Sequence, residues 1–408
     1  MSEPNTKSGR PTTHGCISLH ASGIEGEARV ALLPEHVRLL VEDGWVVRIP
    51  PSLSAGVAVG DAEYAVVGAS VTREAAPDPG RPSLDIFVSP PSQDTILALP
   101  EHTTVLGFLD PFNRPDLVAL LAERGLDSVS LELVPRTTIA QSMDALSSQG
   151  NMAGYAAVIA GVARLRKILP MMSTAAGTVR PARVLVVGTG VAGLQAIATA
   201  QRLGARVTAY DVRAAAKDQV ESLGARFAKI EIGETSEVAG GYATALSDEQ
   251  LDRQRQQLSD LCAESDLIIT TAQVFGKRAP VIVTGEMVAR MRPGSVVVDA
   301  AIATGGNVEP SMLGEEVEID GVVVMGDPNL SSRVAVDASR VLGANIVSLL
   351  KHIVDPETGR VVDVGGELPD PIASAVLLTR GGEVRDERVR STLPQHGPSA
   401  PRSEGSAS

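Results

Sequence analysis

Short apolar runs and amphipathic stretches alternate along the chain, and this alternation is the first guide to its structure. Continuous apolar runs of a few residues are typical of parallel strands that are buried on both faces. They predict strands at residues 16–20, 45–49, 86–88, 104–108, 129–133, 184–187, 205–210, 226–230, 267–270, 295–299 and 322–325. Apolar residues at helical spacing predict helices at residues 34–43, 115–124, 145–168 and 333–353, one that ends at 203 and one that ends near 224. Strands that alternate with helices indicate the α/β class.

A chain of 408 residues is long enough for two domains. We expect residues 15–144 plus 335–385 to form the first α/β domain, and residues 145–334, with the long connecting helix, to form the second. The polar stretches 1–14 and 386–408 are expected to be disordered. The polar segment 233–249 is predicted to be a lid or a disordered loop, because loops of that length are uncommon inside a compact domain.

Composition narrows the class of protein. The net charge is -13 and no basic cluster occurs, which argues against nucleic acid and against an anionic membrane as partners. No apolar run reaches the roughly 18 residues that a membrane-spanning helix needs, and the polar N-terminus has no signal-peptide core. The two cysteines stand apart and the six histidines have no metal-ligand spacing. The sequence therefore predicts a soluble cytoplasmic protein without a metal.

One glycine pattern carries the strongest chemical signal. Gly188, Gly190 and Gly193 follow the apolar run 184–187 and fill the pattern G-x-G-x-x-G where a strand turns into a helix. Asp211 comes directly after the next predicted strand, 18 positions after Gly193, where a carboxylate can accept hydrogen bonds from an adenosine ribose. This βαβ unit predicts a dinucleotide site. We therefore expect two Rossmann-like domains, with doubly wound, mostly parallel sheets joined by long helices.

The identity of the dinucleotide depends on two neighbouring charges. Asp211 accepts from a free 2′-hydroxyl and repels a 2′-phosphate, so NAD(H) is favoured over NADP(H). Arg213 could accommodate a 2′-phosphate instead, or be a solvated arginine at the start of a helix. A second polar group, Arg136, Gln141 and Asp144, lies on the predicted loop before the long helix. Its side chains could hold a nicotinamide carboxamide, or an Arg–Asp pair could simply fix the loop.

Several longer stretches resemble one family. They are Arg-Thr-Thr-Ile-Ala-Gln-Ser-Met-Asp-Ala-Leu-Ser-Ser-Gln-Gly-Asn-Met-Ala-Gly-Tyr (136–155), Pro-Met-Met-Ser-Thr-Ala-Ala-Gly-Thr-Val (170–179), the glycine pattern, Lys-Asp-Gln-Val-Glu-Ser-Leu-Gly-Ala (217–225), Ala-Gly-Gly-Tyr-Ala (239–243), Ile-Thr-Thr-Ala (269–272), Gly-Gly-Asn (305–307) and Ser-Arg-Val-Ala-Val-Asp-Ala-Ser (332–339). Together they resemble the NAD(H)-binding component of proton-translocating nicotinamide nucleotide transhydrogenase. This family shares its fold with alanine dehydrogenase, and the resemblance spans roughly residues 20 to 385.

The resemblance implies a role for each matching residue. Around the nicotinamide it places Arg136, Gln141, Asp144 and Ser147. Around the rest of NAD(H) it places Gly188, Gly190, Val191, Gly193, Asp211, Val212, Arg213, Thr271, Ala272 and Gln273, with Gly241 and Tyr242 on a loop that closes over the cofactor. It also implies a homodimer, an NADP(H)-binding partner subunit and a membrane subunit, so the chain could be peripheral on the inner face of a membrane. Hydride then passes directly between two nicotinamides, and this chain needs no general base.

Departures from the family pattern keep an alternative open. Ile139 stands where the family usually has a second arginine, and Gln273 is a polar replacement beside the cofactor. Of four groups that bind and protonate the substrate in alanine dehydrogenase, only an arginine is matched, by Arg29, while Asp110 and Ala303 occupy the histidine and aspartate positions. The alternative is a stand-alone NAD-dependent dehydrogenase of a small amino or keto acid, with Arg29 binding the carboxylate and Asp110 as acid and base. A third hypothesis is a nucleotide sensor without turnover.

Overall fold

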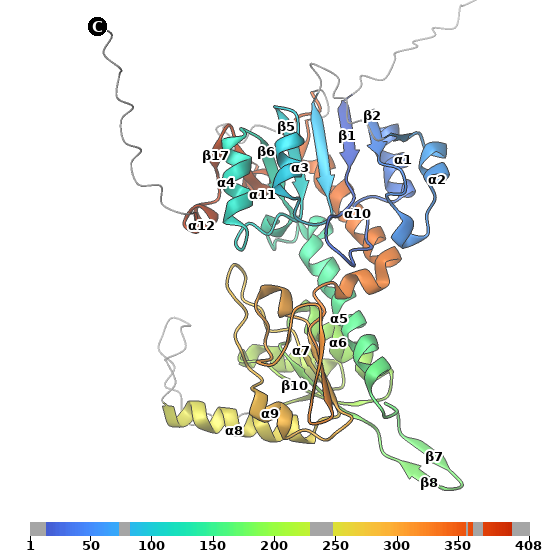
Figure 1. Cartoon of the computed structure of the whole chain (residues 1–408), viewed down its shortest axis with the longest axis vertical. Helices are drawn as coiled ribbons and strands as arrows, with labels where there is room; N and C mark the ends of the chain where they lie inside the picture. Colours follow the sequence, from blue (N-terminus) through green and yellow to red (C-terminus); the bar gives the residue numbers. More distant parts are fainter. Residues whose placement is uncertain (1–13, 73–81, 229–247, 356–357, 362–369, 394–408) are drawn as a thin grey trace, which may run out of the picture. The chain divides into compact units, whose positions relative to one another are not determined.

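The computed structural model describes residues 14–72, 82–228, 248–355, 358–361 and 370–393, with the backbone alone for 248–254. The chain divides into two compact units (Figure 1). Unit 1 comprises Met1–Glu25, Val30–Ala145 and Gly343–Ser408, and unit 2 comprises Gly26–Arg29 and Leu146–Leu342. Two long helices, α5 (Ala145–Arg164) and α10 (Ala335–Ile353), carry the chain from one unit to the other. Four residues before the first predicted helix therefore group with unit 2.

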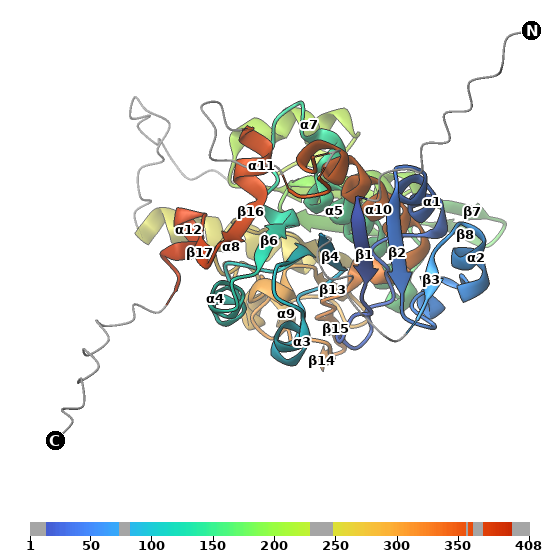
Figure 2. The ribbon, with the colours of Figure 1, turned by 90° about the horizontal axis from the view of Figure 1, so that it is seen from above.

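Unit 1 is built on an eight-stranded sheet in the order β17-β16-β6-β5-β4-β1-β2-β3. Strands β1 to β6 run parallel to their neighbours, and β16 and β17 are antiparallel additions at one edge. Figure 2 shows β1, β2 and β3 side by side. The strands are β1 (Gly15–Leu19), β2 (Trp45–Ile49), β3 (Ser70–Val71), β4 (Ser83–Phe87), β5 (Thr103–Gly107), β6 (Asp127–Ser130), β16 (Leu377–Arg380) and β17 (Glu383–Val384).

The helices of unit 1 begin at residues that favour helix starts. α1 and α4 have proline in their first turn, and Ser92 caps α3 by accepting a hydrogen bond from the Thr95 amide. Leu117 and Leu121 of α4 are fully buried in a cluster with strand residues. The helices are α1 (Pro34–Glu42), α2 (Asp61–Val66), α3 (Gln93–Ala98), α4 (Pro115–Glu123), α11 (Pro371–Val376) and α12 (Glu387–Arg390).

Unit 2 is built on a seven-stranded sheet in the order β11-β10-β9-β12-β13-β15-β14, parallel except for β14 at the edge. Val184 and Val186 of β9 pack in one core cluster, and Leu185 and Val187 pack in another. Both faces are therefore covered, which explains why these strands read as unbroken apolar runs. The strands are β9 (Arg183–Val187), β10 (Arg206–Tyr210), β11 (Arg226–Phe227), β12 (Leu267–Thr270), β13 (Val296–Asp299), β14 (Glu316–Ile319) and β15 (Val322–Met325).

The remaining elements of unit 2 include a separate two-stranded hairpin. Besides α5 and α10, the elements are α6 (Val191–Arg202), α7 (Lys217–Ser222), α8 (Asp248–Glu264), α9 (Gly285–Ala289) and the hairpin strands β7 (Met172–Thr174) and β8 (Gly177–Val179). Short 3-10 segments occur across the chain at Ala55–Val57, Leu131–Leu133, Gln141–Met143, Ala214–Ala216, Ile302–Thr304 and Leu330–Val334. Among the described helices, none is long and apolar enough to cross a membrane.

The predicted α/β class with large, mostly parallel sheets is confirmed, while several element bounds are corrected. The strand predicted at 129–133 ends at Ser130, because the chain then tightens into a 3-10 turn. The helix predicted from 145 to 168 ends at Arg164. The expectation of disorder from residue 386 is wrong at its start, because Asp386 caps α12 and Val389 is fully buried. The predicted ranges do not include helices α2, α3, α8, α9, α11 and α12, strands β3, β14, β16 and β17, or the β7–β8 hairpin.

Candidate functional site

The glycine turn, residues Gly188 to Gly193, joins the carboxyl end of β9 to α6. Gly188 has a φ of 93°, in the left-handed region that glycine adopts without strain. A Cβ on Gly193 would lie 2.0 Å from the Gly188 carbonyl oxygen, so only glycine allows helix and turn to pack this closely. A Cβ on Gly190 would meet no described atom within 4 Å. The turn therefore leaves no room for a side chain at Gly188 or Gly193, while no described atom occupies the space beside Gly190. A pyrophosphate site requires this arrangement.

The turn lies at the topological switch point of the unit 2 sheet. β9 pairs with β10 on one side and with β12 on the other. The connection after β9 leads to β10 and the connection after β12 leads to β13, so the two connections run in opposite directions across the sheet. Ligands of open α/β sheets bind in the crevice at such a point. The Thr271 side chain, just after β12, closes this side by donating to the Gly188 carbonyl oxygen at 3.1 Å. Thr271 and Ala272 are half-buried and Gln273 is exposed.

Asp211 follows β10, as predicted, but its carboxylate is already engaged. Oδ2 accepts from the Thr189 amide at 2.8 Å, from the Thr189 hydroxyl at 2.7 Å and from Arg213 Nη2 at 3.0 Å. Oδ1 accepts from the Arg213 amide at 2.8 Å and from Arg213 Nε at 3.0 Å. Burial alone would raise the pKa of Asp211, but these hydrogen bonds hold it well below its ordinary value. Asp211 is thus a fixed negative charge, and a ribose hydroxyl must compete with the Arg213 guanidinium for it.

In unit 1, the predicted polar loop runs from the end of the sheet into α5. Arg136 and Gln141 are exposed, with Gln141 opening a 3-10 turn, and Asp144 is half-buried. The Asn345 side chain fixes this turn by donating to the Ser142 carbonyl oxygen at 2.8 Å. Ser147, the fourth residue of the predicted group, lies on α5 and belongs to unit 2. The exposed guanidinium and amide can bind a planar amide ligand.

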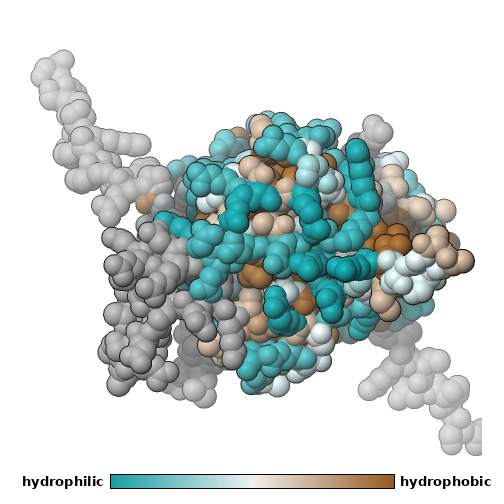
Figure 3. Space-filling model, turned by 90° about the horizontal axis from the view of Figure 1, so that it is seen from below, coloured by the Kyte–Doolittle hydropathy of each residue, from teal (hydrophilic) through white to brown (hydrophobic). Residues whose placement is uncertain are grey.

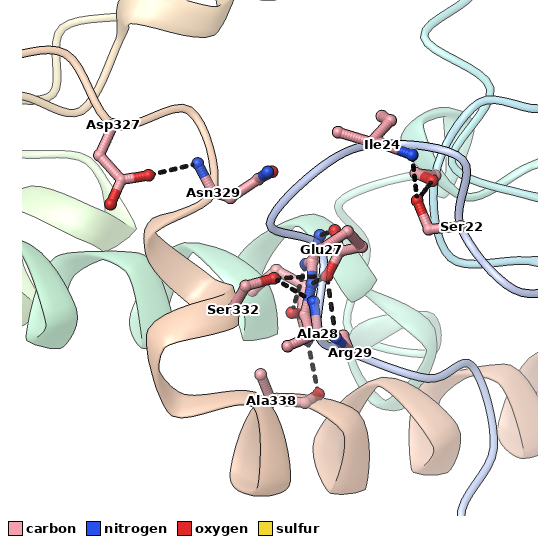
Figure 4. Close-up of polar contacts among 11 residues, drawn as sticks. Ser22, Ile24, Glu27, Ala28, Arg29, Asp327, Asn329, Ser332 and Ala338 are labelled. Atoms are coloured by element: carbon pink, nitrogen blue, oxygen red, sulfur yellow. Dashed lines mark hydrogen bonds and ion pairs between the residues drawn. The ribbon is translucent and has the colours of Figure 1, made fainter. Parts of the chain in front are cut away.

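Arg29, the substrate-binding residue of the alternative hypothesis, forms an internal ion pair within unit 2 (Figure 4). Its Nε and Nη2 donate to the two carboxylate oxygens of Glu27 at 2.8 and 2.5 Å, and Nη1 donates to Gln149 Oε1 at 2.8 Å. Glu27 also accepts from the Ser332 hydroxyl, and Gln149 donates to the Ala338 carbonyl oxygen at 3.0 Å. Glu27 thus occupies the place that a substrate carboxylate would need.

Asp110, the acid and base of the same hypothesis, follows β5 in unit 1. Its φ of 47° is in the left-handed region, and it accepts from Asn113 Nδ2 at 2.7 Å. Burial raises the pKa of Asp110, against the opposing effects of Asn113 and Arg114. The neighbouring Glu132 accepts from the Asp110 amide at 2.7 Å, and burial raises its pKa too. A raised pKa favours the protonated form of a carboxyl group, so Asp110 and Glu132 have the property that a proton carrier in unit 1 would need.

Several site features were not predicted. Thr189, between the glycines, donates to Asp211. Asn307 accepts from the Ala272 amide in the loop after β12, and Asp299 accepts from the backbone amide of Asn307. In unit 1, His20 Nε2 lies 2.6 Å from Asp85 Oδ1 and its ring stacks on Phe87. Gly241 and Tyr242 lie outside the described residues. Within the described portion of the chain, no cluster of His, Cys, Asp or Glu side chains could hold a metal ion.

Comparison with known proteins identifies the family. A model of the alanine dehydrogenase/PNT N-terminal domain matches residues 23–153, and a model of the C-terminal domain matches residues 157–387. The chain belongs to the alanine dehydrogenase/PNT family. Both of its domain types are present in order.

Relatives in this family include both transhydrogenase subunits and alanine dehydrogenases. The chain is 42% identical over 366 residues to an NAD(P) transhydrogenase subunit alpha chain of Rhodospirillum rubrum, covering 88% of this chain and 94% of that protein. It is 30% identical over 323 residues to alanine dehydrogenase of Halomonas elongata, covering 78% and 81%. A crystal structure of transhydrogenase from Sinorhizobium meliloti matches with a TM-score of 0.76 at 37% identity, covering 90% and 98%. The chain is an oxidoreductase of the transhydrogenase type, a nicotinamide nucleotide-binding protein.

Proposed function

We propose that this chain is the NAD(H)-binding subunit of an NAD(P) transhydrogenase, which exchanges hydride between NADPH and NAD+ together with partner subunits. The observation that carries the proposal is the glycine turn with Asp211, in a chain similar over most of its length to transhydrogenase alpha subunits. Val191 and Val212 flank these groups in sequence. The open side of Gly190 and the amino end of α6 fit the pyrophosphate.

The residues of this chain act by binding and orientation. When NAD(H) is bound, its nicotinamide ring supplies the hydride chemistry. Asp211 accepts from the ribose 2′-hydroxyl, while Arg136, Gln141, Asp144 and Ser147 bind and orient the nicotinamide end. A hydride passes without a separate proton, so these side chains need only hold a near-attack geometry, which requires reacting atoms roughly 3–3.5 Å apart.

The choice of NAD(H) over NADP(H) follows from charge. A carboxylate that stays ionised repels a 2′-phosphate and accepts from a 2′-hydroxyl. The lowered pKa of Asp211 keeps it ionised at every physiological pH. Arg213 opposes this preference, and the competition between the two sets the selectivity.

The partners proposed are an NADP(H)-binding subunit, a membrane subunit that holds the complex at the inner face of a membrane, and a second copy of this chain. Relatives named as subunit alpha support the first two. The homodimer is supported by the β7–β8 hairpin, where Met171, Met172 and Val179 are exposed by 66%, 46% and 43%. Figure 3 shows pale and brown residues gathered at the right-hand end, where this hairpin lies, beside a mostly hydrophilic face. Exposed apolar patches of this kind mark association surfaces.

The proposal is tested by mixing the purified chain with the NADP(H)-binding component of a transhydrogenase. We expect reduction of an NAD+ analogue by NADPH, followed by absorbance, and no reduction when either component is omitted. The absence of exchange with every transhydrogenase component tried, by a chain that binds NADH, would show that the assignment is wrong.

The stand-alone dehydrogenase remains a second candidate because burial raises the pKa of Asp110, as an acid–base residue requires. It predicts NADH formation by the isolated chain with a small amino or keto acid. The sensor hypothesis predicts NADH binding with neither activity. The three hypotheses are therefore separated by one binding measurement and two activity measurements.

A further inference from the structure

A buried amide side chain holds the loop that follows β12. Asn307 is fully buried, and its Oδ1 accepts from the Ala272 amide at 2.9 Å. Its Nδ2 donates to the Ala272 carbonyl oxygen at 2.8 Å and to the Pro280 carbonyl oxygen at 2.8 Å. One side chain thus satisfies both backbone groups of Ala272, in the way that a neighbouring strand would. It also ties the two ends of the 272–280 loop together.

Asn307 is itself fixed from the other side by Asp299, the last residue of β13. The fully buried Asp299 carboxylate accepts from the backbone amide of Asn307 at 3.2 and 3.0 Å, and from the backbone amide of Val308 at 3.1 Å. It also accepts from the Thr270 hydroxyl at 3.1 Å. Because Thr270 ends β12, the carboxylate ties the ends of two adjacent parallel strands to the turn that presents Asn307.

Ala272 lies directly against the glycine turn. A Cβ on Gly188 would come within 2.8 Å of the Ala272 amide nitrogen, and the Thr271 hydroxyl donates to the Gly188 carbonyl oxygen. The hydrogen bonds therefore run from Asp299 through Asn307 to Ala272, and the preceding residue, Thr271, is hydrogen-bonded to Gly188 of the glycine turn. A shift of Ala272 would change the shape of the turn that faces a pyrophosphate.

We propose that Asn307 is a positioning residue for nicotinamide nucleotide binding: its carboxamide holds Ala272 against the glycine turn and so keeps the crevice in its binding shape. The proposal rests on nucleotide binding at this turn and adds the group that keeps the turn in place. Asn307 contacts the protein backbone, and it acts on the ligand only through Ala272.

The position requires an amide, because it must accept one hydrogen bond and donate two. An ionised carboxylate donates none and would set a negative charge against two carbonyl oxygens, beside the existing Asp299 carboxylate. Once protonated, a carboxyl group can accept from the Ala272 amide and donate to one carbonyl oxygen. Arg278 brings a cation near this turn, since its side chain lies against Gly305. An acid at this position should therefore function at low pH and fail at high pH.

The experiment measures NADH affinity of the full chain by fluorescence titration between about pH 5 and about pH 8, the range in which folded proteins tend to be most stable. We expect Asn307→Asp to bind NADH roughly tenfold more weakly than the wild type at the high end, about 1.4 kcal/mol, and to recover as the pH falls. Asn307→Ala should bind weakly at every pH. The control is Gln201→Glu, which replaces another amide that donates to a backbone carbonyl, that of Gly224, just before the edge strand β11.

The outcomes separate this proposal from the proposed function. Wild-type affinity in folded Asn307→Asp and Asn307→Ala would overturn it, and so would the same pH profile in Gln201→Glu. If the variants do not fold, the proposal is tested by measuring hydrogen exchange of the backbone amides in the wild type. The Ala272 amide should be protected without NADH, and fast exchange there would contradict the proposal. Failure of the transhydrogenase assay with intact NADH binding would overturn the function and leave the role of Asn307 standing.

Discussion

Removal of the Arg213 side chain should increase the affinity for NADH. The guanidinium supplies two of the five hydrogen bonds that Asp211 accepts, one to each carboxylate oxygen. In Arg213→Ala the Thr189 bonds and the bond from the backbone amide of residue 213 remain, so the carboxylate stays in place. The freed positions can then accept from a ribose hydroxyl without first displacing a cation.

The size of the effect follows from the exposure of the pair. The Arg213 side chain is 63% exposed and Asp211 is 7% exposed, so the pair has the strength of a surface ion pair, about 0.2–1 kcal/mol. NADH affinity should therefore rise by about 1.5- to 5-fold. NADPH affinity should fall, because the 2′-phosphate loses a cation and still faces the carboxylate. Both changes should shrink at high salt, which screens exposed charges.

The chain offers a matched control in unit 1. Arg388 binds Asp386 through its backbone amide, Nε and Nη2, and its side chain is also 63% exposed. Fluorescence titrations with NADH and NADPH should show changed selectivity in Arg213→Ala and unchanged selectivity in Arg388→Ala. A loss of NADH affinity in Arg213→Ala alone would refute the reasoning, since it would mean that the guanidinium binds NADH directly.

Further substitutions test other regions of the molecule. Gly193→Ala should weaken NADH binding at least tenfold and destabilise unit 2 by about 1–3 kcal/mol in thermal melts, because its Cβ would lie 2.0 Å from a backbone carbonyl oxygen. Glu27→Gln should lower the free energy of unfolding by about 3–5 kcal/mol at neutral pH, because it leaves the buried Arg29 guanidinium without its charge partner. Burial opposes ionisation of Glu27, but its hydrogen bonds lower its pKa below the ordinary value of 4.5. The extra stability of the wild type should therefore be full above pH 4.5 and should be lost as the pH falls through the lower pKa of the folded protein. Gln141→Asn should slow hydride transfer in stopped-flow mixing while leaving NADH affinity nearly unchanged, and a large loss of affinity would contradict its proposed role. Asp110→Asn should leave transhydrogenation intact, whereas loss of an amino acid-dependent activity would favour the stand-alone dehydrogenase.

The local features of the nucleotide site could be predicted, and the distant ones could not. The glycine turn and Asp211 belong to one βαβ unit, so their spacing in sequence sets their spacing in space. Asn307 acts on Ala272, which is far from it in sequence, through a contact that exists only once β12 and β13 pair. The sequence signal for Asn307 is the pair of glycines before it. Both have positive φ in the structure, and the turn that they form presents the Asn307 side chain to Ala272.

Arg29 shows the limit of transferring a role by position. Under the alternative hypothesis, its match to a substrate-binding arginine predicted that Arg29 binds a substrate carboxylate, but Glu27, two residues earlier, already binds its guanidinium. Glu27 was therefore the feature of the sequence that indicated an internal ion pair with Arg29. The β7–β8 hairpin escaped prediction for another reason: residues 171–180 are all exposed, so no alternation of buried and exposed positions marks its strands.

The carboxylates of the nucleotide crevice distinguish hydride exchange from ordinary dehydrogenation. Oxidation of an amino or hydroxy acid releases a proton as well as a hydride, so it needs a base that can accept one. Among the residues that the structure describes, the carboxylates of Asp211 and Asp299 are hydrogen-bonded to backbone amides and hydroxyls of the crevice, Asp211 also to a guanidinium, and each is used as a fixed acceptor. A crevice built from such saturated acceptors can orient a dinucleotide but is poorly suited to take up a proton. Exchange between two nicotinamides requires only orientation, and unit 2 is built to provide it.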